Sequence, residues 1–228
     1  MSNKNVIVVA PHPDDETLGC GGTILLLKEQ SYKIFWLITT SISQENGFTK
    51  ERIKKRQKEI KLVSDTYGFE SVINLEIPST KVGEVAYGSL IQMISKEFNE
   101  IKPNILFLPF YNDVHTDHKI IAEACLSCTK WFRYPYIETV LAYETLSETD
   151  FNINTCNKKF EPNVFIDISN YLERKIQIMN IYESEMSDFP FPRSDKAIRS
   201  LAYLRGSQSG SMAAEAFELQ RANVKTSK

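Results

Sequence analysis

Short apolar runs alternate with longer stretches of mixed polarity along this chain. The apolar runs have the length of buried strands and lie at residues 6–10, 34–39, 72–77, 105–108, 139–143 and 164–168. The stretches between them predict helices at residues 23–28, 50–67, 90–101, directly after His118, 170–185 and 195–204. Because the strands lack a clean alternation of polar and apolar residues, the pattern predicts an α/β protein with a three-layer, Rossmann-like fold. A mostly parallel sheet would then be covered by helices on both faces.

The segment Gly19-Cys20-Gly21-Gly22 leads into the first predicted helix. It lacks the Gly-x-Gly-x-x-Gly spacing of a dinucleotide-binding loop and the Lys-Ser/Thr of a P-loop. These glycines are therefore expected to let the helix pack close to the sheet rather than to cradle a phosphate. A nucleotide-dependent enzyme on a similar sheet would need the fingerprint that is missing here.

Composition is that of one ordinary globular domain. The 228 residues are 42% hydrophobic and 25% charged, enough for a single core over residues 1–228. The net charge of -2, with Lys and Arg spread over the predicted helices, offers no nucleic-acid-binding tract and no polybasic membrane surface. No apolar run approaches the roughly 20 residues of a membrane helix, and the first strand follows Met1 without a leader, so a cytoplasmic protein is expected. The four cysteines have no framework spacing, and Cys125 and Cys128 are expected to be buried apolar filler rather than a metal or redox site.

All three histidines lie in two polar clusters, each directly after a predicted strand. His12 lies in Pro11-His12-Pro13-Asp14-Asp15-Glu16, and His115 and His118 lie in Asn112-Asp113-Val114-His115-Thr116-Asp117-His118. Ligands of parallel sheets bind beyond the carboxyl ends of the strands. The two clusters are therefore expected to meet there and to form one metal site.

The residue types in these clusters suit hydrolysis. A catalytic zinc typically takes three His and Asp/Glu ligands and leaves a position open for water, and His12, Asp15 and His118 would supply that set. Asp14 would carry the proton as general base and acid, His115 would donate to the developing oxyanion, and Asp117 would orient one of the rings. A His-Asp-His set suits Fe²⁺ as well as Zn²⁺.

Together the two motifs resemble the signature of the PIG-L/LmbE-like family of zinc-dependent N-acetylglucosaminyl deacetylases. The similarity continues through Leu18-Gly19-Cys20-Gly21-Gly22, Arg56-Gln57-Lys58-Glu59 and Ile101-Lys102-Pro103-Asn104 to Ala214-Glu215-Ala216-Phe217. It implies an LmbE-like fold and a metal-dependent hydrolase that removes the acetyl group from an N-acetylglucosamine-type sugar conjugate. It also implies assembly into homo-oligomers.

Position by position, the resemblance assigns the metal to His12, Asp15 and His118, acid-base catalysis to Asp14 and the electrophilic role to His115. Arg56 matches an arginine that reaches toward the bound sugar conjugate. Two departures concern the substrate: Ala213 stands where the family often has a tyrosine, and Ser184-Glu185 where it has Ser-Gln. The aglycone stays open among thiol-pathway intermediates, lipid-linked sugars, antibiotics and chitin fragments.

Each assignment has a structural competitor. His12 and His118 would otherwise be satisfied core or capping histidines, and Asp14-Asp15-Glu16 would merely cap the first helix. Arg56 and Glu59 would form an i, i+3 ion pair on a helix surface. At the level of function, the competitor is a catalytically silent metal- or sugar-binding member of the same fold, for which the loss of Asp14 or His115 would be the mark.

Two C-terminal stretches are expected to be irregular. Phe189-Pro190-Phe191-Pro192 would either stack on a sugar or pack against a neighbour or another subunit, and Gly206-Ser207-Gln208-Ser209-Gly210-Ser211 would form a mobile loop.

Overall fold

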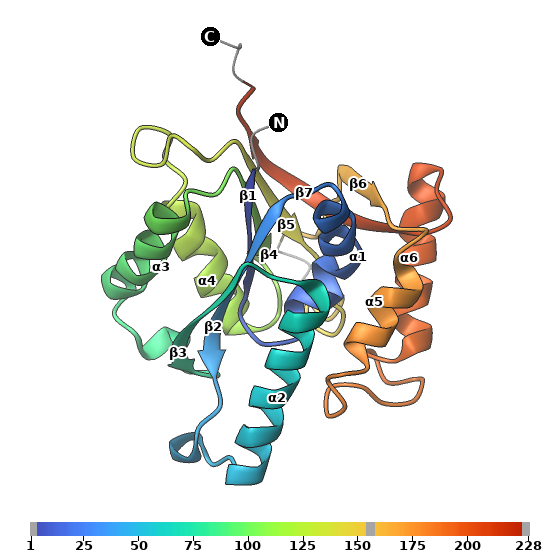
Figure 1. The fold of residues 1–228 in the computed structure, drawn as a ribbon, viewed down its shortest axis with the longest axis horizontal. Coiled ribbons are helices and arrows are strands. Elements are labelled where there is room, and N and C mark those ends of the chain that lie inside the picture. The colour runs from blue at the N-terminus through green and yellow to red at the C-terminus, as the bar shows by residue number, and fades with distance from the viewer. Residues whose placement is uncertain (1–3, 154–157, 225–228) are drawn as a thin grey trace.

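A seven-stranded sheet with helices on both faces forms the framework of the computed structural model, which describes residues 4–153 and 158–224 (Figure 1). Its strand order is β3-β2-β1-β4-β5-β7-β6. The strands are β1 (Asn5–Ala10), β2 (Lys33–Ser41), β3 (Ser71–Pro78), β4 (Ile105–Pro109), β5 (Thr139–Tyr143), β6 (Val164–Asp167) and β7 (Ala214–Ala222). The first five strands pair in parallel, and β7 runs antiparallel to both β5 and β6. The predicted three-layer, mostly parallel α/β fold is confirmed.

The helices divide between the two faces of the sheet. They are α1 (Asp15–Glu29), α2 (Lys50–Tyr67), α3 (Tyr87–Ile101), α4 (Thr116–Ser127), α5 (Leu172–Met179) and α6 (Asp195–Ser209), with short 3₁₀ turns η1 (Gln44–Asn46) and η2 (Val82–Glu84). Figure 1 shows α3 and α4 on one side of the sheet and α1, α2, α5 and α6 on the other. Alternate residues of β1 point into the two cores, Val6 and Val8 into one and Ile7 and Val9 into the other.

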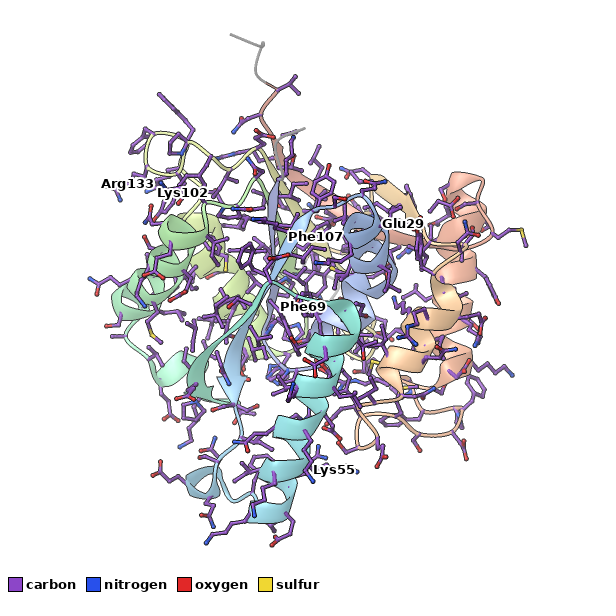
Figure 2. All side chains as sticks on the ribbon, viewed as in Figure 1. Glu29, Lys55, Phe69, Lys102, Phe107 and Arg133 are labelled. Atoms are coloured by element: carbon purple, nitrogen blue, oxygen red, sulfur yellow. The ribbon has the colours of Figure 1, made fainter. Side chains whose placement is uncertain are left out.

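The apolar strands are buried because both faces are covered. Phe107 of β4 is 2% exposed and lies in the middle of the molecule in Figure 2, whereas the charged Lys102 and Arg133 lie at its edge. Among the described residues, no helix is long and apolar enough to cross a membrane. Cys125 and Cys128 are buried and form no disulfide, and Cys156 lies outside the described residues.

Helix α1 begins earlier than predicted, at Asp15, so the glycines lie inside it rather than before it. Their predicted packing role is nevertheless seen. A Cβ atom on Gly19 would lie 2.2 Å from Tyr143 Cδ2, and one on Gly22 would lie 2.6 Å from Ile168 Cγ2. Glycine here lets α1 approach the sheet more closely than any larger residue allows.

The C-terminal helices also differ from the prediction. Helix α5 ends at Met179 instead of continuing to Glu185. Helix α6 runs to Ser209, so most of the glycine- and serine-rich stretch is helical, and the prediction of a mobile loop there is wrong. The physical reason is a buried stripe of Ile198, Ala202 and Gly206 at a spacing of four residues, which holds this part of α6 against its neighbours. Gly210, with φ of 78°, then ends the helix.

Candidate active site

The two histidine clusters meet where the sheet reverses its strand order. Strand β1 pairs with β2 on one side and with β4 on the other, which places the loops after β1 and β4 side by side. The ring centroids of His12 and His115 are 4.5 Å apart, and those of His12 and His118 are 5.4 Å apart. Such a reversal point is where open α/β sheets bind their ligands.

His12, Asp15 and His118 converge as one possible ligand set, with donor atoms within 4.8 Å of one another. Asp15 Oδ2 lies 3.5 Å from His12 Nδ1 and 3.2 Å from His118 Nε2. Nε2 of His118 is buried and, although Asp15 lies close to it, makes no hydrogen bond of suitable geometry in the described chain. Because a buried polar nitrogen without a partner is costly, and because these donors are the usual ligands of zinc, the three residues fit a divalent metal.

The other nitrogen of each ligand histidine faces a carboxylate. His12 Nε2 lies 3.2 Å from Asp117 Oδ2, and His118 Nδ1 lies 2.8 Å from Asp113 Oδ2. Metal-binding histidines usually donate their second N–H in this way, which fixes the ring and its tautomer. The sequence motif predicts this orienting role for Asp117, whereas the role of Asp113 becomes visible in the structure. The spacing of Asp113 five residues before His118, at the same strand end, was the available signal.

The field at this site favours positive charge. Burial opposes protonation of His12, but the hydrogen bonds that its ring donates to Asp117 and Asp15 raise its pKa to about 9. Burial likewise opposes protonation of His118, but Asp15 and Asp113 raise its pKa to about 10. In spite of burial, the two histidines hold the pKa of Asp15 well below its usual range. A cluster that attracts protons this strongly is also suited to a divalent cation.

Asp14 adjoins the ligand set and has an unusual backbone. Its φ of 133° is strained for a residue other than glycine, and its N–H donates to Glu16 Oε2 at 3.0 Å. Its Oδ2 accepts a hydrogen bond of 2.6 Å from Arg193. Burial raises the pKa of Asp14 to about 8, although the charge of Arg193 opposes that rise. Asp14 makes no side-chain capping bond to α1, so capping does not explain this carboxylate.

His115 lies at the N-cap of α4, where its Nδ1 accepts the N–H of Asp117 at 3.1 Å. Burial, together with the charges of His12 and His118, lowers the pKa of His115 to about 4. A neutral ring whose Nδ1 accepts a hydrogen bond carries its proton on Nε2. Nε2 is therefore the atom through which His115 can donate.

Arg56 is buried, whereas the sequence predicted either a side chain that reaches toward the sugar or an ion pair on the helix surface. Its Nη1 donates to Pro13 O at 2.7 Å, its Nη2 contacts Glu185, and its Nε lies 3.2 Å from Glu59 Oε2. The i, i+3 pair with Glu59 exists but is buried rather than on the surface. Arg56 also lines the cavity described next, so it holds Pro13 in the first motif and forms part of the wall.

Arg193 is a site residue that the sequence analysis missed. Besides Asp14, it bonds Ser147 Oγ at 2.9 Å and lies 3.3 Å from Glu148 and 3.4 Å from Glu185. It directly follows the Phe189–Pro192 segment, which is irregular as predicted. Phe189 and Phe191 are exposed and do not line the cavity, so the described chain does not place them against a bound sugar. Their packing against another subunit stays a prediction.

A cavity of about 660 Å³ opens above these residues. Its floor includes His12, Asp14 and His115. Its walls come from the ends of β2 and β3 and the segments that follow them, from α2 and from the loops that carry Glu148, Glu185 and Arg193. This volume is in the usual range for a small-molecule site.

A comparison with protein families matches residues 7–129, more than half of the chain, to the family described as GlcNAc-PI de-N-acetylase (PIG-L). The chain belongs to the PIG-L family. The matched region holds both motifs and therefore every histidine and aspartate discussed above.

Curated relatives of this PIG-L chain are deacetylases. A diacetylchitobiose deacetylase of Thermococcus kodakarensis is 24% identical over 221 residues, covering 93% of this chain and 81% of the relative. A probable N-acetyl-alpha-D-glucosaminyl L-malate deacetylase 2 of Bacillus anthracis is 22% identical over 195 residues, covering 82% of this chain and 83% of the relative. The enzymes named in both cases act on N-acetylglucosamine-containing compounds.

Solved structures share the fold of this PIG-L chain. An N,N'-diacetylchitobiose deacetylase from Pyrococcus horikoshii superposes with a TM-score of 0.76 at 19% identity, covering 96% of this chain and 84% of that one. GalB, a 4-carboxy-2-hydroxymuconate hydratase from a Pseudomonas, superposes with a TM-score of 0.74 at 16% identity, covering 99% of each chain. The same framework therefore supports more than one reaction, and function has to be argued from the site.

Proposed function

We propose that this protein is a metal-dependent hydrolase that removes the acetyl group from an N-acetylglucosamine-type sugar conjugate. The supporting observation is that Asp14, a carboxylate at the cavity, stands beside a possible ligand set that does not include it. The deacetylase relatives support the same chemistry, and a small sugar conjugate fits the cavity.

His12, Asp15 and His118 would hold the metal, with Zn²⁺ as the first choice and Fe²⁺ as the second. When bound, such an ion supplies Lewis-acid chemistry, because it lowers the pKa of water and polarises a carbonyl oxygen. Asp113 and Asp117 bind the ring nitrogens of His118 and His12 that would face away from the metal, and so fix the orientation of both rings.

Asp14 moves the proton. As general base, the Asp14 carboxylate takes a proton from the attacking water, and as general acid it returns that proton to the nitrogen of the departing amino sugar. Burial raises the pKa of Asp14 and so favours its protonated form, which suits the general-acid half of this task. Arg193 and the Glu16 carboxylate fix its side chain and its backbone.

His115 donates from Nε2 to the oxygen of the amide carbonyl as negative charge develops there. Because Nδ1 is already occupied by the Asp117 N–H, the ring has one orientation available for this bond. A silent binding member of the fold would not need both Asp14 and His115, and both line the cavity.

Product analysis tests this function. The metal-loaded protein should convert an N-acetylglucosamine conjugate to equal amounts of acetate and the free amine. The N,N'-diacetylchitobiose and N-acetylglucosaminyl malate named for the relatives are the first substrates to try. Binding of these compounds without acetate release would favour the silent alternative.

A further inference from the structure

Three arginines form one wall of the cavity. Arg52 and Arg56 lie one turn apart on α2, and Arg193 reaches in from the segment before α6. A guanidinium carries five N–H donors in a fork that matches carboxylates and phosphates. Three of them without counter-ions would make this wall a strong binding site for an anionic group on the substrate.

Glu185 contacts all three arginines. Its Oε1 accepts from Arg52 Nη2 at 2.9 Å and also from Arg56 Nη2, and its Oε2 lies 3.4 Å from Arg193 Nη1. Partial burial opposes ionisation of Glu185, but Arg56 and Arg193 hold its pKa below the usual range. One internal carboxylate thus accepts a hydrogen bond from each of the three guanidinium groups of this wall.

The rest of the cavity adds negative charge and hydroxyl groups. Glu148 lies 3.3 Å from Arg193 and supplies it with a further counter-ion. Glu45 and Glu76 line the cavity and form no ion pair with any residue of the described chain. The remaining polar lining consists of neutral side chains, among them Thr40, Ser41, Ser43, Gln57 and Asn74, and Phe48 offers an exposed aromatic ring. Such a lining suits a neutral, hydroxyl-rich ring better than a carboxylate or a phosphate.

We propose that Glu185 sets the substrate class of this cavity. By occupying the arginine wall it selects N-acetyl sugars whose aglycone is an uncharged saccharide and rejects those whose aglycone is anionic. This inference rests on the proposed deacetylase function. An anionic aglycone would have to displace Glu185 from its arginines or lie unpaired near Glu45 and Glu76, and both arrangements weaken binding.

The test compares a neutral and an anionic substrate on the metal-loaded enzyme. The wild type should hydrolyse N,N'-diacetylchitobiose with a kcat/KM at least about 10-fold above that for N-acetylglucosaminyl malate. Glu185→Gln keeps the side-chain shape but removes the charge that pairs the arginines. It should raise the malate-to-chitobiose ratio of kcat/KM by about 10- to 100-fold, the range expected when charge-assisted hydrogen bonds become available to the anion.

Glu183→Gln is the matched control. Glu183 lies two residues away, is largely exposed and pairs with Lys55, which Figure 2 shows on α2, and it does not line the cavity. The Glu183→Gln variant removes the same charge from the protein but leaves the arginine wall unchanged. It should therefore keep the malate-to-chitobiose ratio of kcat/KM at its wild-type value. Adding Arg52→Gln to Glu185→Gln should reverse most of the gain, because Arg52 is one of the arginines that Glu185→Gln releases.

Binding of glucosaminyl malate separates this inference from the deacetylase function. This compound carries the dicarboxylate but has no acetyl group to lose, so its affinity can be measured by calorimetry even if no substrate is hydrolysed. Glu185→Gln should bind it about 10-fold more tightly than the wild type and Glu183→Gln. Equal affinities in all three, or a wild type that prefers the malate conjugate, would overturn the proposal. The preference of the wild type for the chitobiose or the malate conjugate can be measured without any variant. It therefore tests the proposal even if Glu185→Gln fails to fold.

Discussion

Arg193 Nη1 lies 2.6 Å from Asp14 Oδ2, and this hydrogen bond links two residues that are 179 positions apart in the chain. The proposed proton carrier is therefore held by a C-terminal segment, while the metal ligands come from the loop after β1, the start of α1 and the first turn of α4. Ligation and proton transfer can consequently be tested separately.

Asp14→Asn should keep the metal and lose turnover. The asparagine leaves His12, Asp15 and His118 untouched but cannot accept the proton, so kcat should fall by about 100- to 10,000-fold. Metal analysis and acetate-release kinetics on the same sample provide the check. Wild-type kcat in metal-loaded Asp14→Asn would remove Asp14 from the mechanism.

His115→Ala should act on the transition state. Losing a donor to the oxyanion lowers kcat by about 100- to 1,000-fold, or about 3 to 4 kcal/mol, and leaves KM nearly unchanged. Metal content should be that of the wild type, because His115 is outside the ligand set. A variant with normal kcat but a lower melting temperature would show instead that His115 serves only as the cap of α4.

Asp113→Asn should weaken metal binding without removing a ligand. Asp113 accepts from His118 Nδ1 at 2.8 Å and so sets the orientation of that ring. Loss of such a partner typically lowers metal affinity by about 10- to 100-fold. Competition with a chelator of known affinity measures this change, and an affinity equal to that of the wild type would contradict the orienting role.

Lys175→Met should destabilise the fold. Lys175 and Glu215 form a buried ion pair of 2.7 Å, and Glu215 also accepts the N–H groups of Gly22 and Thr23 in α1. Removing one partner of a buried pair leaves an uncompensated charge, which should lower the free energy of unfolding by about 3 to 5 kcal/mol.

Lys61→Met provides the comparison for chemical denaturation, because its ion pair with Asp65 is exposed. That loss should cost less than about 1 kcal/mol. Similar costs for the two lysine variants would mean that the Lys175–Glu215 pair contributes little to stability.

The site could be predicted in part because its chemistry is local in sequence. His12, Asp14 and Asp15 form one short cluster, His115 and His118 another, and each follows an apolar strand. The carboxyl ends of parallel strands lie at the same edge of a sheet, so the meeting of the two clusters can be predicted without knowing the structure of the hundred residues between them.

Arg193 and Glu185 could not be found in this way. Their partners lie on α2 and in the first motif, and nothing in the sequence around Phe189–Arg193 indicates which loop reaches the cavity. The departure at Glu185 was visible as a difference from the family pattern. Its consequence depends on three arginines that only the fold brings together.

Strand β7 could not be predicted from the sequence because charged residues interrupt its apolar pattern. Glu215 and Glu218 are buried within it, which a strand pattern based on apolar runs does not anticipate. Each has partners elsewhere in the chain, Lys175 for Glu215 and Lys158 with the Glu161 N–H for Glu218. A buried carboxylate is tolerated when it is paired in this way, and the pairing becomes visible only in three dimensions.

Metal content and acetate release, measured together on wild-type protein and on His118→Ala, bear on the whole proposal. Wild-type protein holding one divalent ion per chain should release acetate from an N-acetylglucosamine conjugate, lose that activity on chelation and regain it when the metal is restored. His118→Ala should bind the metal poorly and release almost no acetate. Acetate release that persists at full rate in metal-free wild type, or full metal occupancy in His118→Ala, would contradict the assignment.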